Sequence, residues 1–229
     1  MHLATFFDLY QKIKRSLYRV MSYDGSRENA PNGRIHPTIR LACAVRFFSG
    51  GDPLDIMTSY GISKTEVHSS VDYVIQAVND CDGIQIRFPT DHAEQMKISA
   101  GFKALSDADL DNCVGPIDGM LVWTFKQSEE ECKKSGVGSK KFFCGRKHKF
   151  GLNLQAICDH EKRFTYVSIK FPGATSDFLS FEATPLRNKL EIPGFLAPGL
   201  CLFGDNAYVN RPYMATPFPN VPGDNPKDH

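Results

Sequence analysis

The chain has 229 residues, of which 41% are hydrophobic and 23% are charged. This is an ordinary composition for a soluble globular protein and excludes an intrinsically disordered chain. The formal net charge is only +1, so a prediction of nucleic-acid binding has to depend on local clusters of basic residues. No run approaches the roughly 20 apolar residues of a membrane span, and we expect an intracellular protein with no membrane segment.

The first part of the chain is expected to be helical. Residues 1–21 place apolar side chains at helical spacing, and residues 22–37 are rich in glycine, asparagine, proline and charge, as is typical of a linker. We divide this region into an N-terminal helix with its linker, residues 1–35, and a helical segment with a polar connection, residues 36–112.

Three further helices are predicted within residues 38–80. Ser63 stands where an N-cap is needed, and Gly61 suits a left-handed turn just before it. Two helices joined by a short turn that contains glycine have the outline of a helix-turn-helix. The outward face of the last helix carries Lys64 and His68, which could contact DNA phosphates or base edges. A helical hairpin that only packs is the alternative.

From Cys113 onward the hydrophobic period changes to that of strands. Residues 114–118 predict a short strand that ends at Asp118, and residues 121–123 could continue the sheet. Residues 152–158 alternate between apolar and polar positions, and residues 164–171 form a second such run after a turn. We expect these two runs to form a hairpin.

The remaining predicted elements are one helix and one buried strand. Ser176 can cap a helix from Asp177 to about Leu190, and the apolar run 200–203 suits a buried strand. The order strand, hairpin, helix, strand opens an RNase H-like mixed sheet, and the crossover rule places the last strand parallel to the first. The predicted fold class is therefore mixed α/β, with a small all-α segment before a sheet domain that covers residues 113–229.

Two of the predicted strands lead into an aspartate, Asp118 and Asp205. If the strands are neighbours, both carboxylates lie at one edge of the sheet, where ligands bind in such folds. Adjacent carboxylates repel unless a cation holds them, and Mg²⁺ takes one or two carboxylates together with substrate phosphates and water. Such a site could hydrolyse a phosphodiester bond, or transfer a strand to a 3′-hydroxyl. The alternative is that both Asp-Gly and Gly-Asp-Asn sequences are turns.

Four sequence blocks resemble, in order, those of the Harbinger-type (PIF-type) transposases of the DDE superfamily and of the nuclease-like proteins derived from them. They are VGPIDG (114–119), GLNLQAICD (151–159), PGATSD (172–177) and LFGDNAY (202–208). The resemblance runs from about residue 34 to the end and implies a DNA endonuclease that depends on Mg²⁺ or Mn²⁺. It implies that Asp118 and Asp205 are the first two catalytic, metal-binding acids. Asp177 matches a recurrent family position, where it could cap its helix or orient the site.

The third acid of this family is a glutamate several tens of residues after the second, on a helix that follows a proline-aromatic stretch. Here Pro217-Phe218-Pro219 is followed by a tail whose acids, Asp224 and Asp228, we interpret as surface residues. We therefore expect the chain to be truncated at its C-terminal end, to lack the third acid, and to have little activity by itself.

Basic residues cluster between residues 133 and 149, where no acidic residue occurs. The cluster comprises Lys133, Lys134, Lys140, Lys141, Arg146, Lys147 and Lys149, with phenylalanines interleaved. It would suit salt-dependent contact with the DNA backbone, and we expect Lys140, Lys141, Arg146, Lys147 and Lys149 to bind nucleic acid. The alternative is a solvated loop balanced by the acids at 129–131.

The resemblance further implies DNA as the substrate, a nuclear location, and a separate DNA-binding protein as a partner; an oligomer is also possible. Two other hypotheses remain open from the sequence. The chain could be a non-catalytic, transposon-derived protein that binds DNA or a partner, or an RNase H-like hydrolase that acts on RNA.

Overall fold

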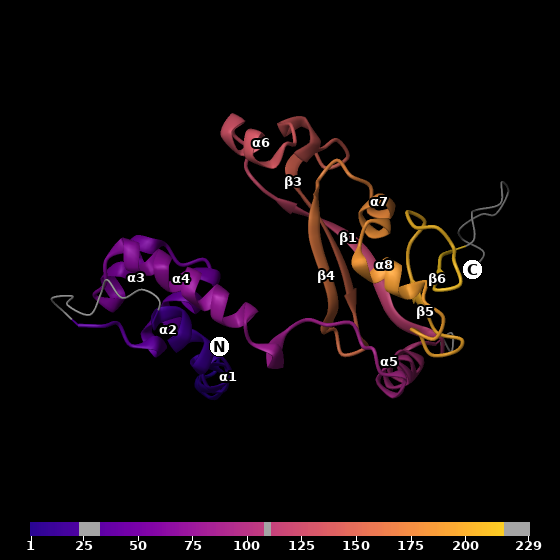
Figure 1. Cartoon of the computed structure of the whole chain (residues 1–229), viewed down its shortest axis with the longest axis horizontal. Coiled ribbons are helices and arrows are strands. Elements are labelled where there is room, and N and C mark those ends of the chain that lie inside the picture. Colours follow the sequence, from indigo (N-terminus) through magenta and orange to yellow (C-terminus); the bar gives the residue numbers. More distant parts are fainter. Residues whose placement is uncertain (23–32, 108–110, 218–229) are drawn as a thin grey trace. The chain divides into compact units, whose positions relative to one another are not determined.

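The computed structural model of the chain describes residues 1–22, 33–107 and 111–217. The chain divides into two compact units, Met1–Gln85 and Ile86–His229 (Figure 1). Within the described ranges, no helix is long and apolar enough to cross a membrane.

The first unit is all helical in its described residues. Its elements are α1 (Leu3–Ser22), α2 (Pro37–Phe48), α3 (Pro53–Tyr60), α4 (Lys64–Asn79) and the short 3-10 helix η2 (Asp82–Ile84). Gly61 ends α3 with a φ of 64°, and the Ser63 hydroxyl accepts a hydrogen bond from the Glu66 N–H to begin α4. The helices predicted from residues 1–21 and 38–80 are confirmed, and α3 and α4 form the predicted helix-turn-helix outline.

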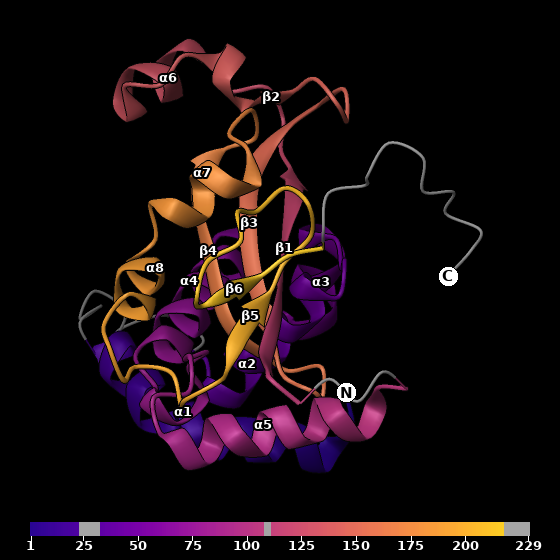
Figure 2. The same ribbon diagram turned by 90° about the vertical axis from the view of Figure 1, so that its right-hand side faces the viewer.

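The second unit combines a sheet with short helices. Its strands are β1 (Cys113–Trp123), β2 (Phe143–Cys144), β3 (Lys149–Cys158), β4 (Phe164–Pro172), β5 (Cys201–Phe203) and β6 (Met214–Ala215). Its helices are α5 (His92–Leu105), α6 (Glu129–Ser135), η3 (Ser139–Phe142), α7 (Asp177–Glu182) and α8 (Pro185–Leu190). Figure 2 shows α7 and α8 against one face of the sheet, with α5 and α6 at its opposite ends.

The strand pairing gives a mixed sheet. Strands β1 and β3 are antiparallel, as are β3 and β4, whereas β1 and β5 are parallel neighbours. Strand β6 adds to β5 in the parallel sense. The predicted hairpin and the predicted parallel pairing of the first and last strands are confirmed. The order and directions agree with an RNase H-like sheet, so the mixed α/β fold class is confirmed as well.

The first strand is longer than predicted. Pairing with β3 continues from Ile117 opposite Ile157 to Trp123 opposite Gly151, so β1 passes through Asp118 instead of ending there. The prediction of a strand end at Asp118 was wrong, because a long antiparallel partner satisfies the backbone on both sides of the Asp118-Gly119 pair. The same pairing excludes a hairpin turn at Asp118-Gly119.

The helix predicted from Asp177 to about Leu190 is in fact two helices. α7 ends at Glu182 and α8 begins at Pro185, with the Thr184 hydroxyl accepting a hydrogen bond from the Arg187 N–H. The interruption arises because proline has no N–H to continue the helix and disfavours helical backbone at the residue before it. The Thr184-Pro185 pair therefore begins a new helix.

The hairpin turn between β3 and β4 depends on Asp159, whose side chain is only 4% exposed. Its carboxylate accepts hydrogen bonds from the backbone N–H groups of Glu161 and Arg163 and from the Arg163 guanidinium. Burial alone would raise the pKa of Asp159, but these hydrogen bonds and the Arg163 charge outweigh it and hold the pKa below its ordinary value of 3.8.

Replacing Asp159 with asparagine should lower the free energy of unfolding at pH 7 by about 1–3 kcal/mol. A carboxyl group whose pKa is lowered by folding stabilises the protein above its unfolded pKa and loses that effect as the pH falls. The difference between wild type and Asp159→Asn in urea unfolding should therefore shrink below about pH 4. A difference that stays constant from pH 7 to pH 3 would contradict this account.

Candidate active site

Asp118 and Asp205 are carried by two neighbouring parallel strands and the segments that continue them. Pro116 of β1 lies opposite Phe203 of β5 in the parallel register, and each aspartate follows two residues later in its own chain segment. Both aspartates are exposed. The Asp118 carboxylate accepts a hydrogen bond from the Gly119 N–H, and that of Asp205 accepts one from the Ala207 N–H.

A single cavity of about 940 Å³ contains both of these carboxylates and a third. Asp118, Asp177 and Asp205 all line it, together with Gly119 and Ala207. None of the three carboxylates forms an ion pair with any residue that the structure describes. Because no basic side chain of the described residues pairs with these three negative charges, the cavity is a candidate site for a cationic ligand.

The third carboxylate, Asp177, is held by amides of β3. Asn153 donates a hydrogen bond to Asp177 Oδ1 at 2.8 Å, and Gln155 donates one at 3.1 Å. The adjacent Ser176 hydroxyl accepts a hydrogen bond from the Leu179 N–H and so caps α7. A Cβ on Gly119 would collide with the Asp177 carboxylate, which means that the glycine in the Asp-Gly pair makes room for it.

A buried polar network extends from these amides. The Tyr208 hydroxyl donates to Gln155 Oε1 at 2.6 Å, and Gln155 itself is only 1% exposed. Burial, followed by the negative charges of Asp177, Asp118 and Asp205, raises the pKa of Tyr208 far above its ordinary value. Tyr208 therefore stays protonated and keeps donating its hydrogen bond.

The alternation along β3 does not by itself predict this network. The buried positions of β3 are Gly151, Asn153, Gln155 and Ile157. Two amides on the same face as a fully buried isoleucine are unusual, because a buried amide needs hydrogen-bond partners. That pattern was the available signal, although its partners on α7 and at Tyr208 are distant in sequence.

Replacing Tyr208 with phenylalanine should lower the free energy of unfolding by about 1–3 kcal/mol, because the buried Gln155 oxygen loses its donor. The conservative change keeps the aromatic ring, which packs edge-on against Phe181. Urea unfolding measures the loss, and Tyr60→Phe on α3, where the ring is 37% exposed, is the control. A Tyr208→Phe protein as stable as wild type would show that the network contributes nothing.

The donor chemistry of the cavity fits a hard divalent cation. Carboxylate oxygens are ligands that Mg²⁺ prefers, and Mg²⁺ usually needs only one or two of them together with phosphate oxygens and water. Within the described residues, no group of three or more His, Cys, Asp or Glu side chains forms a ready-made metal site. Asp118 and Asp205 thus supply part of a coordination shell, which substrate and water would complete.

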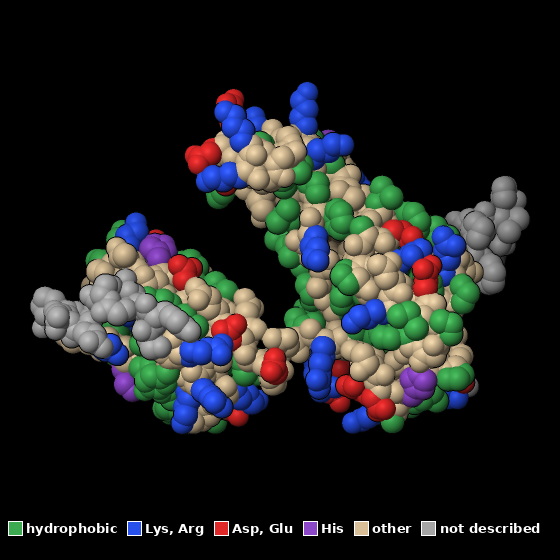
Figure 3. All heavy atoms as spheres, in the orientation of Figure 1, with side chains coloured by type: hydrophobic (Ala, Val, Ile, Leu, Met, Phe, Trp, Pro, Cys, Tyr) green, Lys and Arg blue, Asp and Glu red, His purple; other side chains and the backbone are tan. Residues whose placement is uncertain are grey.

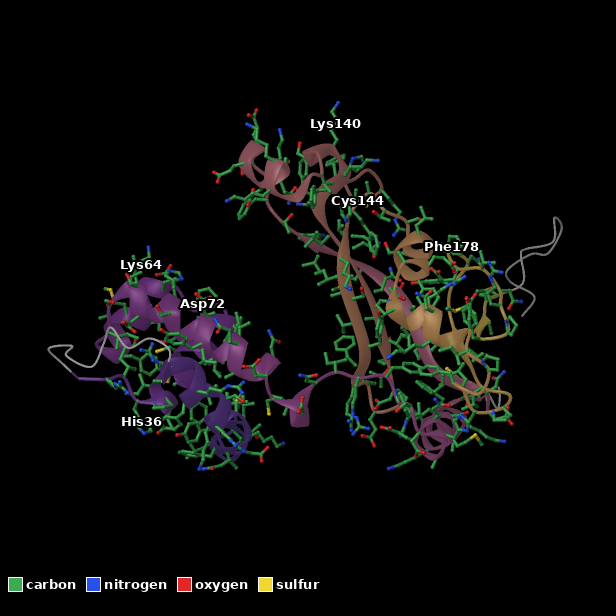
Figure 4. The ribbon with its side chains drawn as sticks, viewed as in Figure 1. His36, Lys64, Asp72, Lys140, Cys144 and Phe178 are labelled. Carbon is green, nitrogen blue, oxygen red and sulfur yellow. The ribbon has the colours of Figure 1, made fainter. Side chains whose placement is uncertain are left out.

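The predicted basic residues occupy an excursion between β1 and β3, and all five are exposed. Arg146 and Lys147 line the same cavity as the carboxylates, and Lys149 begins β3. Lys140 and Lys141 lie on η3, and Figure 4 shows Lys140 extending outward from the tip of the unit. Figure 3 shows Lys and Arg side chains gathered around this tip, with acidic side chains among them.

Lys134 is paired with Glu130 at 2.9 Å, so part of the basic cluster is neutralised locally. Lys140, Lys141, Arg146 and Lys147 form no ion pair with the described part of the chain. Their charges are therefore available to a ligand.

Lys64 and His68 lie in the other unit, on the first turns of α4. Both are exposed, and the His68 ring packs edge-on against Phe47. Lys64 extends outward from the start of the helix (Figure 4). Pro217 is the last described residue; Phe218, Pro219, Asp224 and Asp228 lie outside the described residues.

Residues 120–229 match the family described as DDE superfamily endonuclease, and the mixed α/β sheet of the second unit is consistent with that match. Asp177 and Asp205 fall within the matched segment, and Asp118 lies just before it. Endonucleases of this superfamily generally use divalent metals.

Two curated proteins are similar to the chain. Human "Putative nuclease HARBI1" is 22% identical over 222 residues, which cover 94% of this chain and 60% of the relative. "Protein ALP1-like" of Arabidopsis thaliana is 22% identical over 201 residues, which cover 80% of this chain and 45% of the relative. The chain thus spans about half the length of these relatives. No solved structure matches the chain.

These matches confirm the resemblance to Harbinger-type, transposase-derived proteins.

Proposed function

We propose that this chain carries the core of a divalent-metal-dependent DNA endonuclease of the DDE type. The observation that carries the proposal is the pair Asp118 and Asp205, which neighbouring parallel strands bring to one cavity. Both are exposed carboxylates without an ion-pair partner in the described ranges, so they remain free to bind a cation.

Asp118 and Asp205 would be the residues that hold Mg²⁺ or Mn²⁺. A divalent cation in such a site supplies polarisation of the phosphodiester and activation of the attacking water. Asp118 and Asp205 would hold the cation, and the cation would offset their negative charge and that of an incoming phosphate. With a 3′-hydroxyl in place of water, the same geometry would give strand transfer.

Asp177 is proposed to support the site and not to bind the metal by itself. Its Oδ1 already accepts hydrogen bonds from Asn153 and Gln155, which fix the carboxylate behind Gly119. A carboxylate fixed in this way would add negative charge beside Asp118 without moving during the reaction.

The basic residues are proposed to contact the DNA backbone. Arg146 and Lys147 line the cavity, and Lys140, Lys141 and Lys149 extend the positive surface along the excursion. Lys64 and His68 offer a second contact from the helix-turn-helix outline, which could equally serve a DNA-binding partner protein. Nuclear location, the partner and an oligomeric state remain predictions that follow from the resemblance.

The test is nicking of supercoiled DNA by the purified chain with Mg²⁺, with Mn²⁺ and with EDTA. Because the relatives are longer than this chain, any longer natural form of the protein is assayed in parallel. Nicking that requires a divalent cation supports the proposal. Absence of nicking from every form, at concentrations where DNA is bound, would overturn it.

A second candidate function is a non-catalytic protein that binds DNA or a partner. It is favoured by the absence of a ready-made three-residue metal site among the described side chains. DNA binding that is equally tight with and without divalent cation, together with no nicking, would select this alternative.

A further inference from the structure

Trp123 is the only tryptophan of the chain, and it stands at the end of β1 with 68% of its surface exposed. It lines the same cavity as Asp118, Asp177 and Asp205. Indole rings contribute most when buried in a core or an interface, so a largely exposed indole in a ligand-sized cavity indicates an aromatic contact with a ligand.

One basic side chain contacts the Trp123 ring, and two others line the same cavity. The Lys149 ammonium lies 5.0 Å from the centroid of the indole ring, within the range of a cation–π interaction. Arg146 and Lys147, which precede β3, line the same cavity. Proteins bind single-stranded nucleic acid with aromatic side chains that stack on the bases, in positively charged grooves that follow the phosphate backbone.

We propose that Trp123 stacks on an unpaired base of the DNA substrate while Lys149, Arg146 and Lys147 contact the adjoining phosphates. The inference rests on the proposed function and names its substrate class: DNA that presents an unpaired nucleotide next to the cleaved bond. In an intact duplex each base is covered by its neighbours and cannot present a face to Trp123, whereas a single strand, a flap or a melted end can.

The strand geometry places the stacked base away from the reacting bond. Trp123 lies five residues after Asp118 on one continuous strand, about 17 Å along it at 3.3–3.4 Å per residue. The odd spacing directs the two side chains to opposite faces of β1, and the cavity reaches both faces around the edge of β1, which pairs with β5 only up to Pro116. The unpaired base would therefore belong to a nucleotide a few positions from the cleaved phosphodiester. Trp123 would thus select which DNA strand is bound and fix its position, whereas Asp118 and Asp205 would serve the cleavage reaction.

The test uses the intrinsic fluorescence of Trp123, which reports on this residue alone because the chain has no other tryptophan. Short oligothymidine, oligouridine and a hairpin duplex are titrated into the full chain in EDTA, so that cleavage plays no part. We expect oligothymidine to quench the fluorescence. We also expect Trp123→Ala to weaken oligothymidine binding roughly tenfold, measured by fluorescence anisotropy, with a smaller change for the duplex.

Trp123→Phe should retain part of the affinity, because it keeps an aromatic face. Phe125→Ala is the matched control, since Phe125 is 97% exposed two residues further on and does not line the cavity. Three outcomes would overturn the inference: an equal loss of duplex and single-strand binding in Trp123→Ala, oligothymidine binding without quenching, or no single-strand binding at all. Tighter binding of oligouridine than of oligothymidine would overturn the assignment of the substrate to DNA. Quenching without any metal-dependent nicking would leave the stacking site standing and remove the proposed function.

Discussion

Replacing Asp118 or Asp205 with asparagine is expected to slow metal-dependent nicking of supercoiled DNA about a hundredfold to a thousandfold. The amide keeps the shape of the side chain but loses the negative charge that a hard divalent cation requires. Both side chains are exposed and form no ion pair within the described part of the chain, so the substitutions should leave the fold unchanged. Circular dichroism and urea unfolding check that condition.

The matched control for these two variants is Asp72→Asn, which removes one negative charge from the exposed side of α4 (Figure 4). Asp72 does not line the cavity, so its replacement should leave the nicking rate within a factor of about two of wild type. If Asp118→Asn and Asp205→Asn nicked as fast as Asp72→Asn, the activity would come from a contaminant or from a different site.

The second large effect is expected for DNA binding. Replacing Lys140, Lys141, Arg146 and Lys147 together with glutamine should weaken duplex binding at low salt by at least about a hundredfold. Each lost phosphate contact lowers the slope of log affinity against log salt by about 0.9, so the slope should become shallower by about 3 to 4. Anisotropy titrations over a series of salt concentrations in EDTA give both quantities.

A control for this variant removes the same number of charges elsewhere on the second unit. The exposed lysines chosen for it are Lys97, Lys162, Lys170 and Lys189. Their replacement by glutamine changes the net charge by the same amount without touching the cavity or the excursion. If both fourfold variants reduced affinity and salt slope equally, DNA binding would follow total charge, and the excursion would not be a specific contact surface.

Much of the fold could be predicted because its signals are local. Hydrophobic period, caps and turn glycines depend on neighbouring residues, as Ser63 and Gly61 illustrate at the start of α4. The pairing of β1 with β5 followed from the crossover rule, which needs only the order of the elements. The length of β1 could not be predicted, because it is set by the long antiparallel partner β3.

The site was predictable only in outline. Asp118 and Asp205 could be proposed because each follows a short apolar run in the sequence and the family resemblance marks the same positions. The hydrogen bonds that hold Asp177 join β3 to α7 and Tyr208, and no local pattern predicts contacts between segments so far apart in sequence. The sequence predicts only a strand at Trp123, because its contact with Lys149 follows from the pairing of β1 with β3, in which Trp123 lies opposite Gly151.

The most direct test of the central claim is Mn²⁺ binding to the purified chain, followed by electron paramagnetic resonance of the free ion. We expect saturable binding by the wild-type chain, with the affinity lowered at least about tenfold in Asp118→Asn and in Asp205→Asn and unchanged in Asp72→Asn. Equal Mn²⁺ affinity in all four proteins, or no binding by the wild-type chain, would contradict the claim that these two aspartates form a divalent-metal site.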